Sequence, residues 1–251
     1  MKVVFYTLAL DSMPYIKMQL PIFEESGLDF FWYVSHGAAA NTGSTKWCQK
    51  QEPRLSKDGT TEFLNSISNH PRVKVFNRQW WSGGKDEMCQ IAINNIQQPC
   101  LLGQIDSDEI YTAKQLRKIH DIFLEQSIAR MYLKCRYFYG KDIYVDPESD
   151  RNNSWLRFWR FRPGMVGVVH EPPSLNGNKG SFMSADESAR LGLVFDHFSY
   201  ATKEQLIYKE NFYGYKGLVD SWLKLQRHEK FPCMATEFFP FASPTAVLKK
   251  L

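Results

Sequence analysis

The sequence predicts an α/β fold. Short apolar runs alternate with segments of helical spacing up to about residue 125, a pattern typical of strands that are buried on both faces of a sheet and covered by helices. The second half carries longer, partly alternating strands and irregular segments. Hydrophobic residues make up 43% of the 251 residues, which suffices for a large core in one domain.

The first half is expected to contain four strands and four helices. The strands are predicted at residues 3–10, 30–34, 73–76 and 100–105, and the helices at 18–23, 60–67, 88–96 and 112–123. Residues 38–51 are small and polar and are expected to form a loop. The helix at 112–123 begins at a capping box formed by Thr112 and Gln115.

The second half is expected to be less regular. Strands are predicted at 131–139 and within 156–169, and helices run from a capping box at Thr202 and over 218–225. Residues 174–186 are not periodic and contain two glycines, so they are predicted to form a mobile loop.

Composition excludes several classes of protein. The net charge of +4, from 31 basic and 27 acidic residues, is too small to indicate nucleic-acid binding. The five cysteines have neither zinc-ligand spacing nor the pattern of a disulfide framework, which favours a reducing, cytoplasmic location. No apolar run approaches the ~18 residues of a membrane span, which leaves only peripheral membrane contact open.

Three acidic residues follow the strand predicted at 100–105. Asp106, Asp108 and Glu109 stand at the carboxyl end of a buried strand, where α/β sheets bind ligands. Carboxylate oxygens are the ligands preferred by Mg²⁺ and Mn²⁺. The alternative is an acidic turn that leads into the helix at Thr112.

Two further groups of residues carry candidate chemistry. His197 is either a core histidine or a neutral imidazole that completes a metal site, with Lys209 and Tyr200 available to a phosphate group. His170 and Glu171 leave the strand region 156–169 together. The arginines of this region are interpreted as a solvated strand face rather than as a patch for an acidic substrate; they are Arg157, Arg160 and Arg162.

In combination these motifs resemble the GT-A family 2 glycosyltransferases. The similarity is greatest to the inverting branch that includes lipopolysaccharide-core glucosyltransferases and peptide S-glycosyltransferases. It is carried by Asp-Ser-Asp-Glu at 106–109, Val-His-Glu at 169–171 and His-Phe-Ser-Tyr at 197–200, followed by Lys209 and Tyr213, and it extends over residues 3–215.

The resemblance implies a GT-A fold, a Rossmann-like nucleotide-diphospho-sugar transferase with a mixed central sheet. Residues 1–251 would form one domain, with a nucleotide-sugar-binding half at 1–125 and an acceptor-binding half at 126–251. The implied activity is metal-dependent, inverting transfer of a sugar from a nucleotide-sugar donor, with UDP-sugars favoured, to a hydroxyl acceptor such as a glycan. The alternative is a non-catalytic carbohydrate- or nucleotide-binding protein on a degenerate GT-A fold.

The resemblance also implies roles for individual residues. Asp108 is expected to be the main ligand of Mn²⁺ or Mg²⁺, with Asp106 on the ribose or the metal and His197 as the third ligand. Glu171 is expected to be the general base, and Asp186 with Glu187 form the rival. Glu109 would take a structural role. The loop at 174–186 would close over the donor.

The donor contacts follow from the same implied arrangement. They are predicted to be Asp11, Ser35, His36, Lys85, Asp106, Tyr200 and Lys209. The end of the second strand, Ser35-His36-Gly37, departs from the family, in which an acidic residue usually lies near the nucleobase. Asp11 has a helix N-cap as its alternative role, and Lys85 that of a solvated lysine in a first helical turn.

Overall fold

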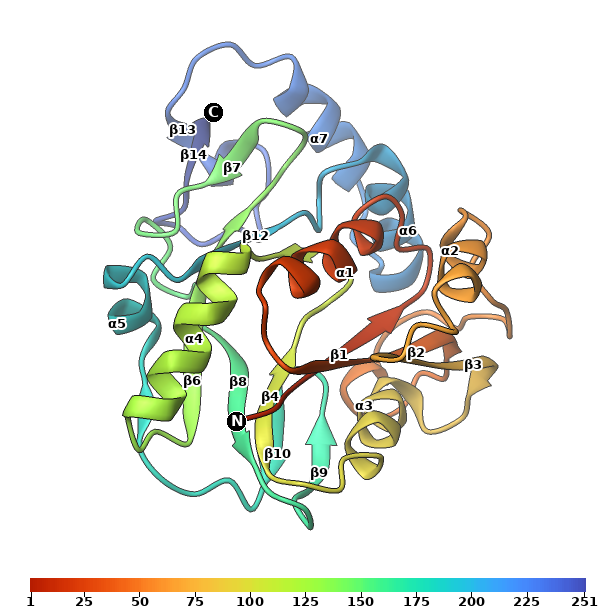
Figure 1. Ribbon diagram of the computed structural model, residues 1–251. Helices are drawn as coiled ribbons and strands as arrows, with labels where there is room; N and C mark the ends of the chain where they lie inside the picture. Colours follow the sequence, from red (N-terminus) through yellow and green to blue (C-terminus); the bar gives the residue numbers. More distant parts are fainter.

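A mixed nine-stranded sheet forms the centre of the molecule (Figure 1). The computed structural model describes the backbone of residues 1–251 and the side chains of all of them except residues 44, 167 and 168. The strands of the sheet are β1 (Val3–Ala9), β2 (Phe30–Ala39), β3 (Val73–Trp81), β4 (Cys100–Gln104), β5 (Glu109–Ile110), β6 (Arg130–Tyr137), β8 (Trp155–Phe161), β11 (Phe182–Met183) and β12 (Val194–His197). Their order is β3-β2-β1-β4-β8-β6-β12-β5, with β11 paired to β6.

One strand in the main body of the sheet, β8, runs opposite to the others. β3, β2, β1 and β4 are parallel, whereas β8 is antiparallel to both of its neighbours, β4 and β6. β12 is then parallel to β6 and antiparallel to the short β5. The predicted α/β class with a mixed central sheet is therefore confirmed.

The helices lie on the surfaces of this sheet. They are α1 (Ile16–Glu25), α2 (Thr60–Ser66), α3 (Gly84–Asn94), α4 (Ala113–Glu125), α5 (Ala185–Arg190), α6 (Lys203–Tyr213) and α7 (Leu218–Gln226), with 3₁₀ turns η1 (Gly43–Thr45) and η2 (Ala235–Glu237). The predicted capping boxes at the starts of α4 and α6 are confirmed. In each, the Thr side chain accepts a hydrogen bond from the Gln backbone N–H, and the Gln side chain accepts one from the Thr backbone N–H.

Three apolar clusters hold these elements together. α1 and α4 pack on one face of the sheet, where Phe23 meets Phe5 at a ring-centroid distance of 4.2 Å. α3 packs on the other face, around Trp159. The third cluster lies at the top of Figure 1, where α6 and α7 meet a small sheet. That sheet contains β13 (Cys233–Met234), β14 (Val247–Lys250) and β7 (Ile143–Val145).

The prediction of a loop at 174–186 is wrong over most of that segment. β10 (Ser174–Asn176) pairs antiparallel with β9 (Val166–Val169), and β11 adds to the main sheet beside β6. Leu175 and Met183 are buried in the two clusters on the sheet faces. The sequence did not predict these two short strands, because Leu175 and Met183 are single apolar residues among small polar ones and form no periodic pattern.

No helix among the described residues is both long enough and apolar enough to cross a membrane. The five cysteines are free thiols, and four of them are buried.

Candidate functional site

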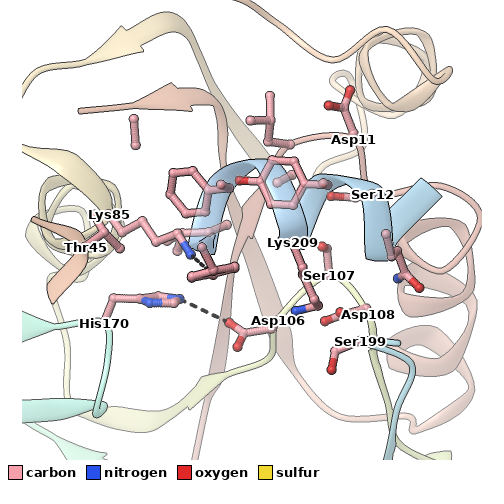
Figure 2. Close-up of a pocket in the computed structure, with 18 of the residues that line it drawn as sticks. Asp11, Ser12, Thr45, Lys85, Asp106, Ser107, Asp108, His170, Ser199 and Lys209 are labelled. Atoms are coloured by element: carbon pink, nitrogen blue, oxygen red, sulfur yellow. Dashed lines mark hydrogen bonds and ion pairs between the residues drawn. The ribbon is translucent and has the colours of Figure 1, made fainter. Parts of the chain in front are cut away.

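A cavity of about 1020 Å³ opens at the carboxyl ends of β1 and β4. Parallel strands of an α/β sheet characteristically present their ligand sites at this edge. The wall opposite the strand ends comes from α6 and the segment before it, which the third apolar cluster holds in place. Figure 2 shows the labelled side chains of the sheet edge and of α6 pointing toward one another across this space.

The floor of the cavity rests on a buried ion pair. Glu109 is fully buried, and Arg157 donates to it from Nη2 at 2.6 Å and from Nε at 2.9 and 3.0 Å. Arg157 Nη2 also lies 3.3 Å from Oδ2 of Asp106. The interpretation of Arg157 as part of a solvated strand face is therefore wrong: it is 2% exposed, because β8 lies between two other strands.

The other two arginines of that region differ from Arg157. Arg160 donates to the backbone carbonyls of Phe123, Ile128 and Gln126, so it ties β8 to the end of α4. Arg162 is exposed, as the sequence interpretation expected.

Charge keeps the carboxylate of Asp106 ionised. Burial raises the pKa of Asp106, but the charges of Arg157 and His170 outweigh it and bring the pKa well below its usual range. For Glu109, burial prevails over Arg157, and the pKa is raised. Asp106 is also held from behind, because Tyr6 Oη donates to Gln104 Oε1 at 2.6 Å and Gln104 Nε2 lies 3.3 Å from Asp106 Oδ1.

Asp108 and His197 form the second charged pair of the cavity. Antiparallel pairing of β12 with β5 places His197 opposite Glu109, so its Nε2 lies 3.4 Å from Oδ1 of Asp108. Burial lowers the pKa of His197. The nearby carboxylates of Asp108, Glu109 and Asp106 raise it by more, so the net shift of the pKa is upward. Burial raises the pKa of Asp108, but His197 and Lys209 bring it below its usual value.

His170 and Glu171 enter the cavity from the side opposite β12. His170 Nε2 lies 3.7 Å from Oδ1 of Asp106, an ion pair drawn as a dashed line in Figure 2. Its backbone N–H donates to Asp86 Oδ1 at 2.9 Å, which fixes the start of this segment on α3. Glu171 is exposed and lines the cavity, so its carboxylate is accessible to a bound molecule.

Two lysines and two tyrosines lie together in the upper wall. Lys209 descends from α6 toward Asp106 and Asp108 in Figure 2, and its Nζ lies 4.7 Å from the ring centroid of Tyr200. Burial lowers the pKa of Lys209, Asp108 raises it and Lys85 lowers it, with a net downward shift. Lys85 Nζ lies 3.3 Å from Tyr213 Oη, so Lys85 is directed into the cavity.

Asp11 lines the same cavity. It has a positive φ of 49°, forms an ion pair with Arg54 and accepts the backbone N–H of Lys57 at 3.0 Å. Asp11 is not an N-cap, because α1 begins after Tyr15 without a side-chain cap. Arg54 also lines the cavity, and the sequence reasoning missed it, because it stands in a polar connection without any periodic signal.

Four of the predicted residues do not line the cavity. Ser35 Oγ donates to the carbonyl of Met88 at 2.7 Å. His36 is fully buried between Asn77 and Ser56, with ring-nitrogen contacts of 2.8 and 2.9 Å. The remaining two are Asp186, which pairs with Lys134 at 2.8 Å, and Glu187, which belongs to the capping box of α5.

The donor set for a divalent cation is incomplete in the protein alone. Within the part of the chain whose side chains are described, no three His, Cys, Asp or Glu residues are arranged to hold a metal ion. Asp108 and His197 face each other, with His197 Nδ1 buried and without a hydrogen-bond partner, whereas Asp106 is engaged by Arg157. A carboxylate and an imidazole therefore fit a cation only if a bound phosphate and water supply further ligands.

Comparison with known proteins gives similarity of shape only. No protein family matches the chain, and no curated protein matches its sequence. Crystal structures of S. aureus TarS 1-349, including complexes with UDP-GlcNAc and with UDP, align with 64% of this chain at 17% identity and a TM-score of 0.45. A longer TarS structure aligns with 92% of this chain and 44% of its own, at 14% identity and a TM-score of 0.46.

A further similar structure is 4-diphosphocytidyl-2C-methyl-D-erythritol synthase, with 10% identity over 80% of this chain and 91% of its own and a TM-score of 0.39. The chain spans about half the length of the TarS 1-349 chains, with 45–47% of each aligned. All these TM-scores lie below 0.5, so the function is argued from the residues of the site.

Proposed function

We propose that the protein is a glycosyltransferase that moves a sugar from a nucleotide-sugar donor to a hydroxyl acceptor. The observation that carries this proposal is the convergence of Asp106, Asp108, His197 and Lys209 beside an accessible carboxylate, Glu171, in one large cavity.

The donor would lie across the floor of the cavity. Its nucleoside would be directed toward Asp11 and Arg54. The carboxylate of Asp11 and the guanidinium of Arg54 suit the polar edges of a base and ribose. Its diphosphate would lie beneath Lys209 and Lys85, the two lysines directed into the cavity. We favour a UDP-sugar as donor.

A divalent cation would be shared between protein and donor. Asp108 and His197 would hold Mn²⁺ or Mg²⁺, and donor phosphate oxygens would complete its coordination. When bound, the ion neutralises the negative charge that develops on the leaving nucleoside diphosphate. Asp106, held in place by Arg157 and Gln104, would orient the ribose or a water of the metal.

Glu171 would act as the general base of an inverting reaction. It would take the proton of the acceptor hydroxyl as that oxygen forms a bond to the anomeric carbon and the bond to the diphosphate breaks. His170, next to it in the chain, contacts Asp106, which supports a position for Glu171 beside the proposed donor site. The rivals, Asp186 and Glu187, lie outside the cavity.

Donor binding gives the first test. Thermal unfolding is measured with UDP, GDP, CMP, dTDP and their sugars, each with Mn²⁺ and with EDTA. A ligand that binds the native state raises Tm by mass action. We expect UDP to raise Tm in Mn²⁺, EDTA to remove the effect, and Asp108→Asn to remove it as well. Asp29→Asn, at an exposed position outside the cavity, is the matched control. A folded protein that responds to no nucleotide contradicts the proposal.

The second candidate function is non-catalytic binding of a carbohydrate or nucleotide. It is favoured by the incomplete metal-donor set of the protein alone. Asp108→Ala separates the two functions. In an enzyme it abolishes release of the nucleoside diphosphate in the presence of acceptor, whereas in a binding protein it leaves carbohydrate binding unchanged.

A further inference from the structure

A row of stacked aromatic rings leads out of the cavity on the side of Glu171. We call Trp47, Tyr213, Tyr215 and Phe241 the aromatic ladder. Neighbouring ring centroids are 5.5 Å apart from Trp47 to Tyr213, 5.4 Å from Tyr213 to Tyr215 and 5.6 Å from Tyr215 to Phe241. The last two pairs are within 20° of parallel, whereas Trp47 is tilted by 38° against Tyr213.

The ends of the ladder are open to solvent although its rings are large and apolar. Trp47 is 54% exposed and Phe241 is 52% exposed. The fold does not need this exposure, since Phe239, two residues before Phe241, is fully buried in the third apolar cluster. Exposed rings that gather at the mouth of a cavity are typical of a binding surface.

Tyr215 connects the cavity to a second, smaller pocket of about 100 Å³. It lines both, and Phe241 lines the smaller one together with Lys216 and Ser221. Tyr215 is therefore the shared wall between the proposed reaction site and a shallow subsite that carries an ammonium group and a hydroxyl, with Tyr213 on one side and Phe241 on the other. A molecule longer than one sugar, placed with one end at Glu171, would extend along this wall.

We infer that the aromatic ladder and the pocket beside it bind the sugar residues of an oligosaccharide acceptor. A pyranose ring presents C–H groups on its faces and hydroxyls on its edges. It therefore needs ring faces to stack on and polar groups at their edges, and the ladder supplies the rings while its tyrosine hydroxyls, Lys216 and Ser221 supply the polar groups. This inference rests on the proposed function and names its acceptor class.

The carboxylate of Glu171 lies near two tyrosines of the ladder, which is consistent with an acceptor that extends from Glu171 along the rings. Burial raises the pKa of Tyr213 and of Tyr215, and the nearby carboxylate of Glu171 raises both further. Both hydroxyls therefore stay protonated as hydrogen-bond donors at neutral pH. They face the same carboxylate that would deprotonate the end of the acceptor.

The test uses saturation-transfer NMR on the full chain with tetrasaccharides of glucose, N-acetylglucosamine, mannose or galactose as probes. Irradiation of aromatic protons is expected to transfer signal to sugar C–H protons of at least one probe. Phe241→Ala should weaken its binding about 2- to 10-fold, the factor for losing one aromatic stacking contact. Phe241→Tyr keeps a ring and should restore binding.

Phe182→Ala is the matched control, because Phe182 is 55% exposed on β11, outside both pockets. Binding should be unchanged in this variant. An equal loss in both variants, or no transfer to any tetrasaccharide, overturns the inference. Sedimentation with phosphatidylglycerol vesicles that depends on Phe241, without any sugar signal, also overturns it and makes the ladder a membrane contact.

The outcome is distinguishable from failure of the proposed function. The UDP-dependent rise in Tm should be the same in Phe241→Ala as in the native chain. A normal UDP response without sugar binding refutes the acceptor inference alone. Sugar binding without any nucleotide response supports the ladder as a sugar site and refutes the transferase.

Discussion

Removing Arg157 should be among the most costly single changes to this protein. Arg157 and Glu109 are 2% and 0% exposed, and three contacts of 2.6 to 3.0 Å join them. Arg157→Met leaves Glu109 as a buried carboxylate without its charged partner. Breaking a buried pair in this way costs about 3–5 kcal/mol of unfolding free energy, against about 0–1 kcal/mol for an exposed pair.

The assay is urea denaturation at pH 7, with Lys250→Met as the surface control, since Lys250 and Asp142 pair at 3.4 Å with both side chains exposed. The double variant Arg157→Met/Glu109→Gln should lose less stability than Arg157→Met alone, because no unpaired charge stays buried. The deficit of Arg157→Met should also shrink as the pH falls and Glu109 takes up a proton. A loss below about 1 kcal/mol, or a double variant that loses the sum of both single changes, would refute this reasoning.

Three further predictions concern the site and its frame. In EDTA, the stability that the pair of Asp108 and His197 contributes should be largest between the reference pKa values of 3.8 and 6.5. It should fall as pH rises through the raised pKa of His197 or drops through the lowered pKa of Asp108, which urea denaturation of His197→Gln at several pH values checks. Lys209→Met should weaken UDP binding about 10- to 100-fold by calorimetry, the loss of one charged contact, while exposed Lys203→Met should not. Gly37→Ala should lower Tm strongly, since its φ is 127° and a Cβ would lie 1.7 Å from a backbone oxygen; an unchanged Tm contradicts that geometry.

Local signals in the sequence predicted much of the fold. The run at 3–10 is apolar except for Thr7, and it contains β1, which is paired on both sides. The capping box at Thr112 involves only residues three apart, so it needs no knowledge of the tertiary structure. The acidic residues after β4 were found because strand ends and polarity coincide there.

What the sequence left open depends on the order of the strands. Arg157 is buried because β8 is inserted between β4 and β6, and no local pattern reveals a neighbouring strand. Ser35 and His36 were predicted at the end of their strand, but β2 continues to Ala39, and α3 and the segment after β2 occupy their hydrogen-bonding atoms. Arg54 was missed because it lies in an irregular connection, 43 residues along the chain from Asp11, its partner in the ion pair.

The third apolar cluster has a consequence for how the protein can diversify. Its buried residues all follow position 138, and the partly buried Tyr137 packs against both this cluster and the first one. Tyr200, Tyr215 and Phe239 pack within it, next to the rim of the cavity. The ring centroid of Tyr200 lies 4.7 Å from Lys209 Nζ and that of Tyr137 lies 4.8 Å from that of His197, so substitutions at these two positions are coupled to the site, whereas positions farther from it have nearly additive effects on stability. Substitutions limited to the segment after Tyr213 leave His197, Tyr200 and Lys209 in place and are therefore the more direct route to altered acceptor preference with an unchanged donor.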